Sequence, residues 1–174
     1  MKSTDVYAIL RKELAPHFNS MGFKRGRSLL SWARERSGLF TVFWCQVSQD
    51  GWDEFAGSKF TVELQRSEQG EPGKPSALRS RMARLLSPEG REDIRRIQNA
   101  VIANLRQPPS THPALHVSPQ VTAWYRSRFV PESVPYTSQT DIWLRYASPV
   151  HVAKWARFLA THAAILVQAI EREA

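Results

Sequence analysis

The feature that most constrains this fold is a block of three consecutive segments in which apolar and polar residues alternate. These segments are 28–36, 39–48 and 58–66. The third alternates most cleanly, with Phe60, Val62 and Leu64 separated by polar residues. Successive side chains of a strand point to opposite faces, so the pattern predicts one buried face and one face in solvent. A tight Ser37-Gly38 turn and a longer loop join the segments, which favours an antiparallel meander.

Helical periodicity flanks this block. Within residues 4–20, apolar residues recur every three or four positions, the spacing of one helix face. They are Tyr7, Leu10, Leu14 and Phe18. Later helices begin at serine-proline pairs, which supply a hydroxyl N-cap followed by proline at the first helical position. The pairs are Ser87-Pro88, Ser118-Pro119 and Ser148-Pro149. The last pair begins a predicted helix over about 149–172.

The middle of the chain changes from strands to helices. Residues 67–76, rich in glycine, proline and glutamate, form a flexible connector. The spacing of Leu78, Met82 and Leu85 indicates an amphipathic helix after it, and 140–147 resembles a fourth strand. Because the strands come as a block, we expect an α+β fold with an antiparallel sheet of about four strands and helices mainly on one face. The 174 residues fit a single domain over 1–174.

Composition limits the compartment. The single cysteine, Cys45, lies in the apolar run LFTVFWCQV, so no disulfide framework exists and a buried, small hydrophobic role is expected. Charged residues interrupt the N-terminal stretch before a signal-peptide apolar region can form, and no segment is long and apolar enough to cross a membrane. We expect a cytoplasmic protein that does not bind membranes.

No catalytic or cofactor motif stands out. The chain has no phosphate-binding glycine loop and no nucleophile elbow, and we expect no cofactor and no metal. His112 and His116 are four residues apart, but prolines surround them and no acid or cysteine completes a ligand set. The acidic cluster Asp50, Asp53 and Glu54 favours a solvated loop over an acid/base site. An enzyme whose site assembles only in space stays open.

Basic residues provide the sharper candidate surface. The formal net charge is +8, which favours nucleic acid or an acidic protein as the unknown partner. The main candidate residues are Arg79, Arg81, Arg84, Arg91, Arg95 and Arg106. A secondary candidate is the turn formed by Lys24, Arg25 and Arg27. We expect an anionic partner to lie against the first set, although solvated helix faces explain the same charges.

The stretch MGFKRGRSLLSWARER, residues 21–36, gathers basic residues around one tryptophan. Trp32, Arg34 and Arg36 alternate with Ala33 and Glu35, so they share one face of a strand. The stretch lacks the aromatic-rich pattern of sheets that stack RNA bases. We expect a solvated turn and strand face.

Gly22-Phe23-Lys24 after the first helix, followed by LFTVFWCQVSQD and SKFTVELQ, resembles the uncharacterised bacterial family named domain of unknown function 4304. The similarity covers roughly residues 5–66. It implies an α+β fold and carries no catalytic residue.

Three hypotheses follow for function. The first is a non-enzymatic bacterial interaction module, such as an accessory or toxin-immunity protein, because an amphipathic fold with several aromatic residues lacks any catalytic motif. The second is a nucleic-acid-binding accessory protein that uses the arginine-rich helical surface. The third is an enzyme with a spatially assembled site.

Overall fold

One antiparallel sheet and the helices that cover it organise the chain. The computed structural model describes residues 1–27, 30–74 and 78–173. The elements in order are α1 (Ser3–Ser20), β1 (Lys24–Arg25), β2 (Leu30–Arg36), β3 (Leu39–Val47), β4 (Ser58–Ser67), β5 (Leu78–Arg81), α2 (Met82–Leu85), α3 (Pro88–Ala103), the 3-10 helix η1 (Pro113–Leu115), α4 (Pro119–Ser127), β6 (Leu144–Tyr146) and α5 (Pro149–Arg172). The structure confirms the predicted α+β class.

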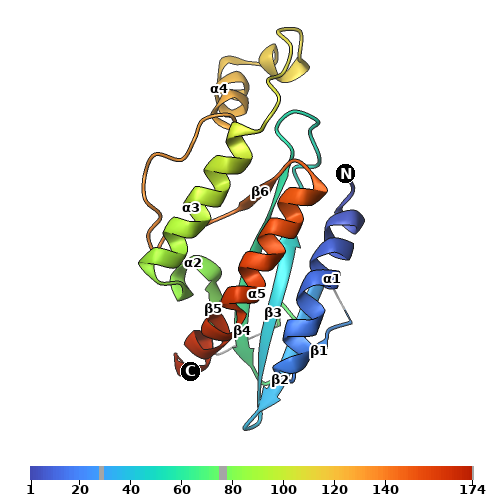
Figure 1. The fold of residues 1–174 in the computed structure, drawn as a ribbon, viewed down its shortest axis with the longest axis vertical. Helices are drawn as coiled ribbons and strands as arrows, with labels where there is room; N and C mark the ends of the chain where they lie inside the picture. The colour runs from blue at the N-terminus through green and yellow to red at the C-terminus, as the bar shows by residue number, and fades with distance from the viewer. Residues whose placement is uncertain (28–29, 75–77, 174) are drawn as a thin grey trace.

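The strands run in the order β1-β2-β3-β4-β5, and every pairing is antiparallel (Figure 1). The predicted meander is therefore confirmed, with Trp32 of β2 opposite Phe43 of β3. Two short strands pair with different parts of the β4 edge that faces away from β3. Residues 63–66 of β4 pair with β5, and residues 58–60 pair with β6.

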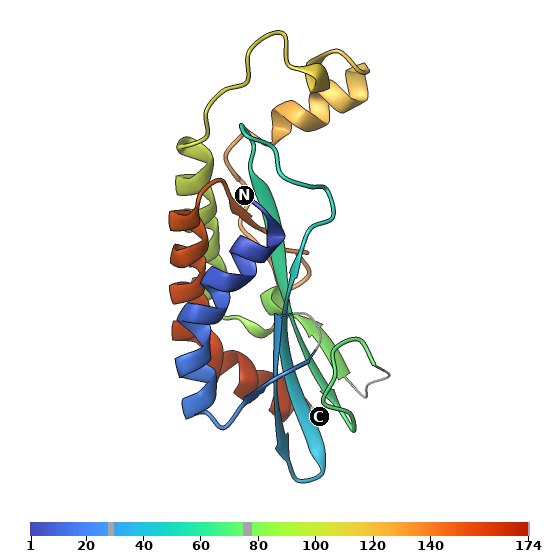
Figure 2. The same ribbon diagram turned by 90° about the vertical axis from the view of Figure 1, so that its right-hand side faces the viewer.

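The long helices α1 and α5 lie on one face of the sheet (Figure 2). Phe18 of α1 stacks on Trp32 with ring centroids 4.7 Å apart, and both side chains are fully buried. The expectation that Trp32 lies on a solvated strand face is therefore wrong. Trp32 belongs to the core because its face of β2 is the face that α1 covers. Cys45 is fully buried on the same side, as its apolar run predicts.

The helix starts were predicted correctly. The hydroxyls of Ser87, Ser118 and Ser148 each accept a backbone N–H three residues later, so all three serine-proline pairs begin helices. The helix that the spacing of Leu78, Met82 and Leu85 predicts is wrong for its first half, where Leu78–Arg81 forms β5 instead. The backbone groups along the edge of β4 require partners, and pairing with β5 satisfies them. The fourth predicted strand shortens to Leu144–Tyr146.

The second face of β4 is not the wet surface that its alternation predicts. Thr61, Glu63 and Gln65 are all buried, with no more than 4% of any residue exposed. Glu63 forms ion pairs with Arg79 and Arg81, which lie across its carboxylate. Gln65 hydrogen-bonds to Ser67 and to the backbone of residues 71 and 73, so the connector covers this face. The polar residues are buried because each has a partner.

A carboxylate at the end of α5 joins that helix to three strands. Glu171 Oε1 lies 2.7 Å from both Arg34 Nη2 and Thr41 Oγ1, and 3.8 Å from Arg66 Nη1. Arg34 also donates to the carbonyl of Met21, just beyond α1. Burial alone would raise the pKa of Glu171, but the hydrogen bonds and the two arginine charges outweigh it and hold the pKa below its ordinary value of 4.5.

We predict that Glu171→Gln lowers the free energy of unfolding by about 1 to 3 kcal/mol at pH 7, because charge-assisted hydrogen bonds are lost. A lowered pKa stabilises the fold above pH 4.5 and ceases to do so as the pH falls through the folded value. The difference from wild type in urea unfolding should therefore shrink at pH 3. Glu173→Gln is the matched control, since Glu173 lies 3.9 Å from the exposed Arg84. Equal effects of the two substitutions would contradict the assignment.

Candidate functional site

Residues 104–143, which we call the arm, connect α3 to β6 and carry η1 and α4. Figures 1 and 2 show that α4 lies beyond one end of the sheet. Six prolines fall within the arm, which explains its irregular backbone. Four of the seven large apolar residues that the described chain exposes also lie there. They are Val117, Trp124, Val130 and Val134.

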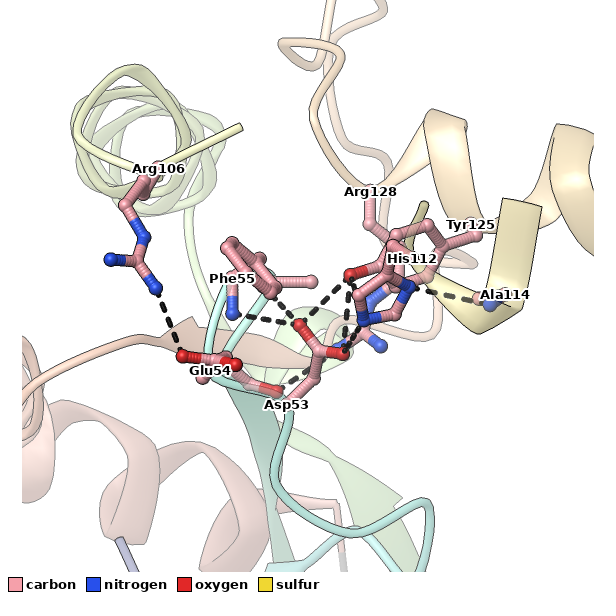
Figure 3. Close-up of polar contacts among 10 residues, drawn as sticks. Asp53, Glu54, Phe55, Arg106, His112, Ala114, Tyr125 and Arg128 are labelled. Carbon is pink, nitrogen blue, oxygen red and sulfur yellow. Dashed lines mark hydrogen bonds and ion pairs between the residues drawn. The ribbon is translucent and has the colours of Figure 1, made fainter. Parts of the chain in front are cut away.

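A cluster of three side chains fastens the arm to the loop between β3 and β4. The hydroxyl of Tyr125 lies 3.0 and 3.1 Å from the two carboxylate oxygens of Asp53 (Figure 3). His112 stacks on the Tyr125 ring at 4.7 Å, and its Nε2 lies 3.5 Å from Asp53 Oδ2. We call Asp53, His112 and Tyr125 the latch. The sequence had assigned Asp53 to a solvated loop, and that expectation is wrong.

A tight turn presents Asp53 to the arm. The backbones of Asp53 and Gly57 exchange two hydrogen bonds, and Asp53 Oδ1 accepts the N–H groups of Phe55 and Ala56. Gly57 has a φ of +65°, and a Cβ there would lie 2.0 Å from the carbonyl oxygen of Tyr146. Only glycine fits this close approach, so the turn is fixed against β6.

The polar groups of the latch bond to one another and to the nearby backbone. Burial and the bond to Asp53 raise the pKa of Tyr125 to about 12, so its hydroxyl stays protonated and donates to the carboxylate. Burial alone would raise the pKa of Asp53, but the backbone N–H groups and Tyr125 hold it below 3.8. His112 Nδ1 accepts the N–H of Ala114, which places the proton of a neutral ring on Nε2, toward Asp53. Every polar group of the latch is used internally.

Two arginines contact the turn that carries Asp53. Arg106 forms an ion pair with Glu54 at 2.9 Å and lies over the Phe55 ring. Arg128 donates to the carbonyl of Gly57 at 3.2 Å. The Arg106 pair is exposed and therefore contributes little stability. His116, the other histidine singled out in the sequence, contacts Ser110 instead of the latch. In the part of the chain that the structure describes, no group of three or more potential metal ligands occurs.

The arm and the sheet enclose a cleft of about 320 Å³. Its wall from β6 carries Trp143, just before the strand, and Arg145, while the alternate residues Leu144 and Tyr146 are buried in the core. Gln98 of α3 holds this strand in place, because its amide donates to the carbonyl of Trp143 and accepts the N–H of Arg145. The cleft is also lined by Trp124 of α4 and by Arg128, the residue after that helix, and Lys59 of β4 lies beside Arg145.

The structure brings the main candidate arginines to internal partners. Each guanidinium contacts an acid or a backbone carbonyl: Glu63 for Arg79 and Arg81, Glu173 for Arg84, the carbonyls of residues 83 and 86 for Arg91, Glu92 for Arg95, and Glu54 for Arg106. Lys24, Arg25 and Arg27 are exposed, and none forms an ion pair within the described residues. Whether either set binds an anion stays a prediction.

Sequence reasoning named Asp53 and His112 but did not single out Tyr125, Trp124 and Arg145. Tyr125 and Arg145 have partners far away along the chain, at positions 53 and 59, and the cation that lies over Trp124 belongs to Arg128, four residues later. The available signal was the absence of any acid between residues 94 and 131, a stretch with five arginines. A stretch that lacks acids but contains arginines indicates a basic surface, but it does not show which residues form a site.

Comparison of the chain with protein-family models, with curated proteins and with solved structures finds no match in any of the three. Among the described residues, no helix has the length and apolar character needed to cross a membrane. The fold and the contacts of the arm are therefore the basis for a functional proposal.

We predict that Tyr125→Phe releases the arm, because the ring still packs while the bond to Asp53 is lost. Trypsin should cut at Arg126 and Arg128 faster in the variant, and amide hydrogens of residues 104–143 should exchange faster. Since the pKa of Asp53 is lowered, the attachment holds above pH 3.8 and weakens as the pH falls below that value.

Tyr7→Phe is the control for this prediction, because the Tyr7 hydroxyl accepts the backbone N–H of Val47, at 3.5 Å, in β3. It should leave proteolysis of the arm unchanged. An arm equally protected in Tyr125→Phe and wild type would show that the latch does not hold it.

Proposed function

We propose that this protein is a non-enzymatic interaction module of the bacterial cytoplasm that binds an acidic protein partner through the arm. The observation that carries the proposal is the set of exposed apolar side chains on the arm, which includes Trp124, half of which is exposed. Tryptophan and arginine are the residue types most enriched in binding hot spots. Arg128 lies over the Trp124 ring at 5.4 Å, so both types occur together here.

Charge supports an acidic partner. Between residues 104 and 131 the arm contains Arg106, Arg126 and Arg128 and no acid. Complementary charge speeds encounter and selects partners. An accessory or toxin-immunity role remains part of the proposal. The latch supports a non-enzymatic role, because its groups bond to one another and leave no nucleophile or base free.

The proposal predicts a partner that contacts the arm. A photo-crosslinking residue at Val134 should give a discrete adduct in the native host, whereas the same residue at the exposed Ile165 of α5 should not. The captured protein is then purified and its affinity measured directly. Trp124→Ala should weaken binding by about 30-fold, the loss typical of a hot-spot aromatic, and Ile165→Ala should not change it. Identical adducts at both positions, or unchanged binding by Trp124→Ala, would overturn the proposal.

A second candidate function is nucleic-acid binding, and one observation favours it. Lys24 and Arg25 of β1 and Arg27 just beyond it are exposed and have no acidic partners in the described chain. The sequence favours the arginines of residues 79–106 as the binding surface, but their guanidinium groups already contact partners. Phosphate binding by cations without acidic partners releases counterions, so Lys24, Arg25 and Arg27 are the better surface.

If the protein binds DNA, replacing Lys24, Arg25 and Arg27 with alanine should reduce the slope of log affinity against log salt by up to about three. The matched variant replaces Arg91, Arg95 and Arg106 and should change the slope less. A larger change of this slope in the second variant would favour the arginines of residues 79–106 as the binding surface, as the sequence predicts. If the wild-type protein does not bind DNA at low salt, the protein-partner proposal is the one that remains.

A further inference from the structure

The cleft brings together positive charges that destabilise one another. Lys59 of β4 and Arg145 of β6 are direct cross-strand partners. Like charges opposite each other in an antiparallel pair are unfavourable. Arg128 also lines the cleft, and burial together with the charge of Arg128 lowers the pKa of Arg145. The fold holds this arrangement in place through Gln98, which hydrogen-bonds to the backbone on either side of Leu144.

Acidic side chains of the protein do not pair with all of these cations. Lys59 pairs with Asp50 at 2.9 Å, and one nitrogen of Arg128 donates to a carbonyl. The guanidinium of Arg145 forms no hydrogen bond and no ion pair with any described residue. Glu132 lines the cleft and acts on Arg145 only through its charge, while Asp141 bonds to Trp143 and Arg81. Arg145 therefore has free donors beside an open volume.

The remaining lining indicates what kind of molecule fits. Trp124 and Trp143 contribute indole rings, and Lys59 lies over the Trp143 ring at 5.2 Å. A volume of about 320 Å³ matches a small molecule or one side chain. A carboxylate or phosphate accepts two parallel hydrogen bonds from a guanidinium, and a flat ring packs against indole.

We propose that the cleft is a binding site for a small organic anion that has one carboxylate or phosphate group attached to a planar ring. The anionic group pairs with Arg145 and neutralises the repulsion among Arg145, Lys59 and Arg128. The ring lies between Trp124 and Trp143. This site overlaps the exposed apolar residues of the arm at Trp124. It does not depend on the identity of a protein partner.

The proposal makes a prediction in which binding and stability change in opposite directions. Benzoate and phenyl phosphate are the probes, with benzyl alcohol as the uncharged control, and binding is followed by shifts of the indole N–H signals in NMR spectra. One or both anions should bind wild type and raise its melting temperature, because a ligand specific for the folded state stabilises it. Arg145→Met should weaken anion binding at least tenfold and raise the melting temperature of the ligand-free protein, since it removes a repelled charge.

Arg157→Met is the matched control, because Arg157 is an exposed arginine of α5, and it should bind the anions like wild type. The preferred probe distinguishes a carboxylate from a phosphate ligand. If Arg145→Met does not fold, Arg145→Lys replaces it: the charge remains, the two-pronged contact is lost, and binding should still weaken. Absence of binding by both anions, equal binding of benzyl alcohol, or undiminished binding by the Arg145 variant would overturn the proposal. A folded Arg145→Met that melts below wild type would also overturn it.

Discussion

The burial of one apolar face of the sheet under α1 and α5 is the constraint on which the rest of the structure depends. Trp32, Phe43 and Leu64 lie on that face and are fully buried. A slip of one residue in any strand would turn such side chains to the opposite face, so their burial fixes the register. The ion pair between Glu171 and Arg34 joins α5 to β2 at the end of the helix. Because apolar side chains occupy this face, polar side chains lie on the second face of the sheet and in the arm.

The sequence predicts those features that depend on neighbours along the chain. An N-cap serine before proline acts within one helical turn, so all three helix starts were predictable. The strand at Leu78–Arg81 was not, because the spacing of Leu78 and Met82 fits a helix and only the open edge of β4 decides otherwise. Glu63 is buried for the same reason: Arg79 and Arg81, which pair with it, come from a distant segment.

Counting charges predicts a basic protein but cannot tell a free cation from a paired one. Of the arginines in the main candidate set, Arg91 donates to backbone carbonyls between α2 and α3 and helps to hold the two helices together. Arg145 attracts no attention in the sequence because it lies in a short strand with mixed neighbours. Its significance comes from the cross-strand pairing with Lys59 and from a cleft that three separate segments form.

The latch and the cleft are mechanically linked through adjacent residues of α4. Tyr125 points inward to Asp53, whereas Trp124 is exposed and lines the cleft. Fixing the first residue therefore fixes the backbone that carries the second. On the opposite wall, Gln98 fixes the strand that carries Arg145. Side chains held before a ligand arrives lose less conformational entropy on binding, which increases affinity. Because the pKa of Asp53 lies below 3.8, the carboxylate that accepts the Tyr125 hydroxyl stays ionised across the neutral pH range.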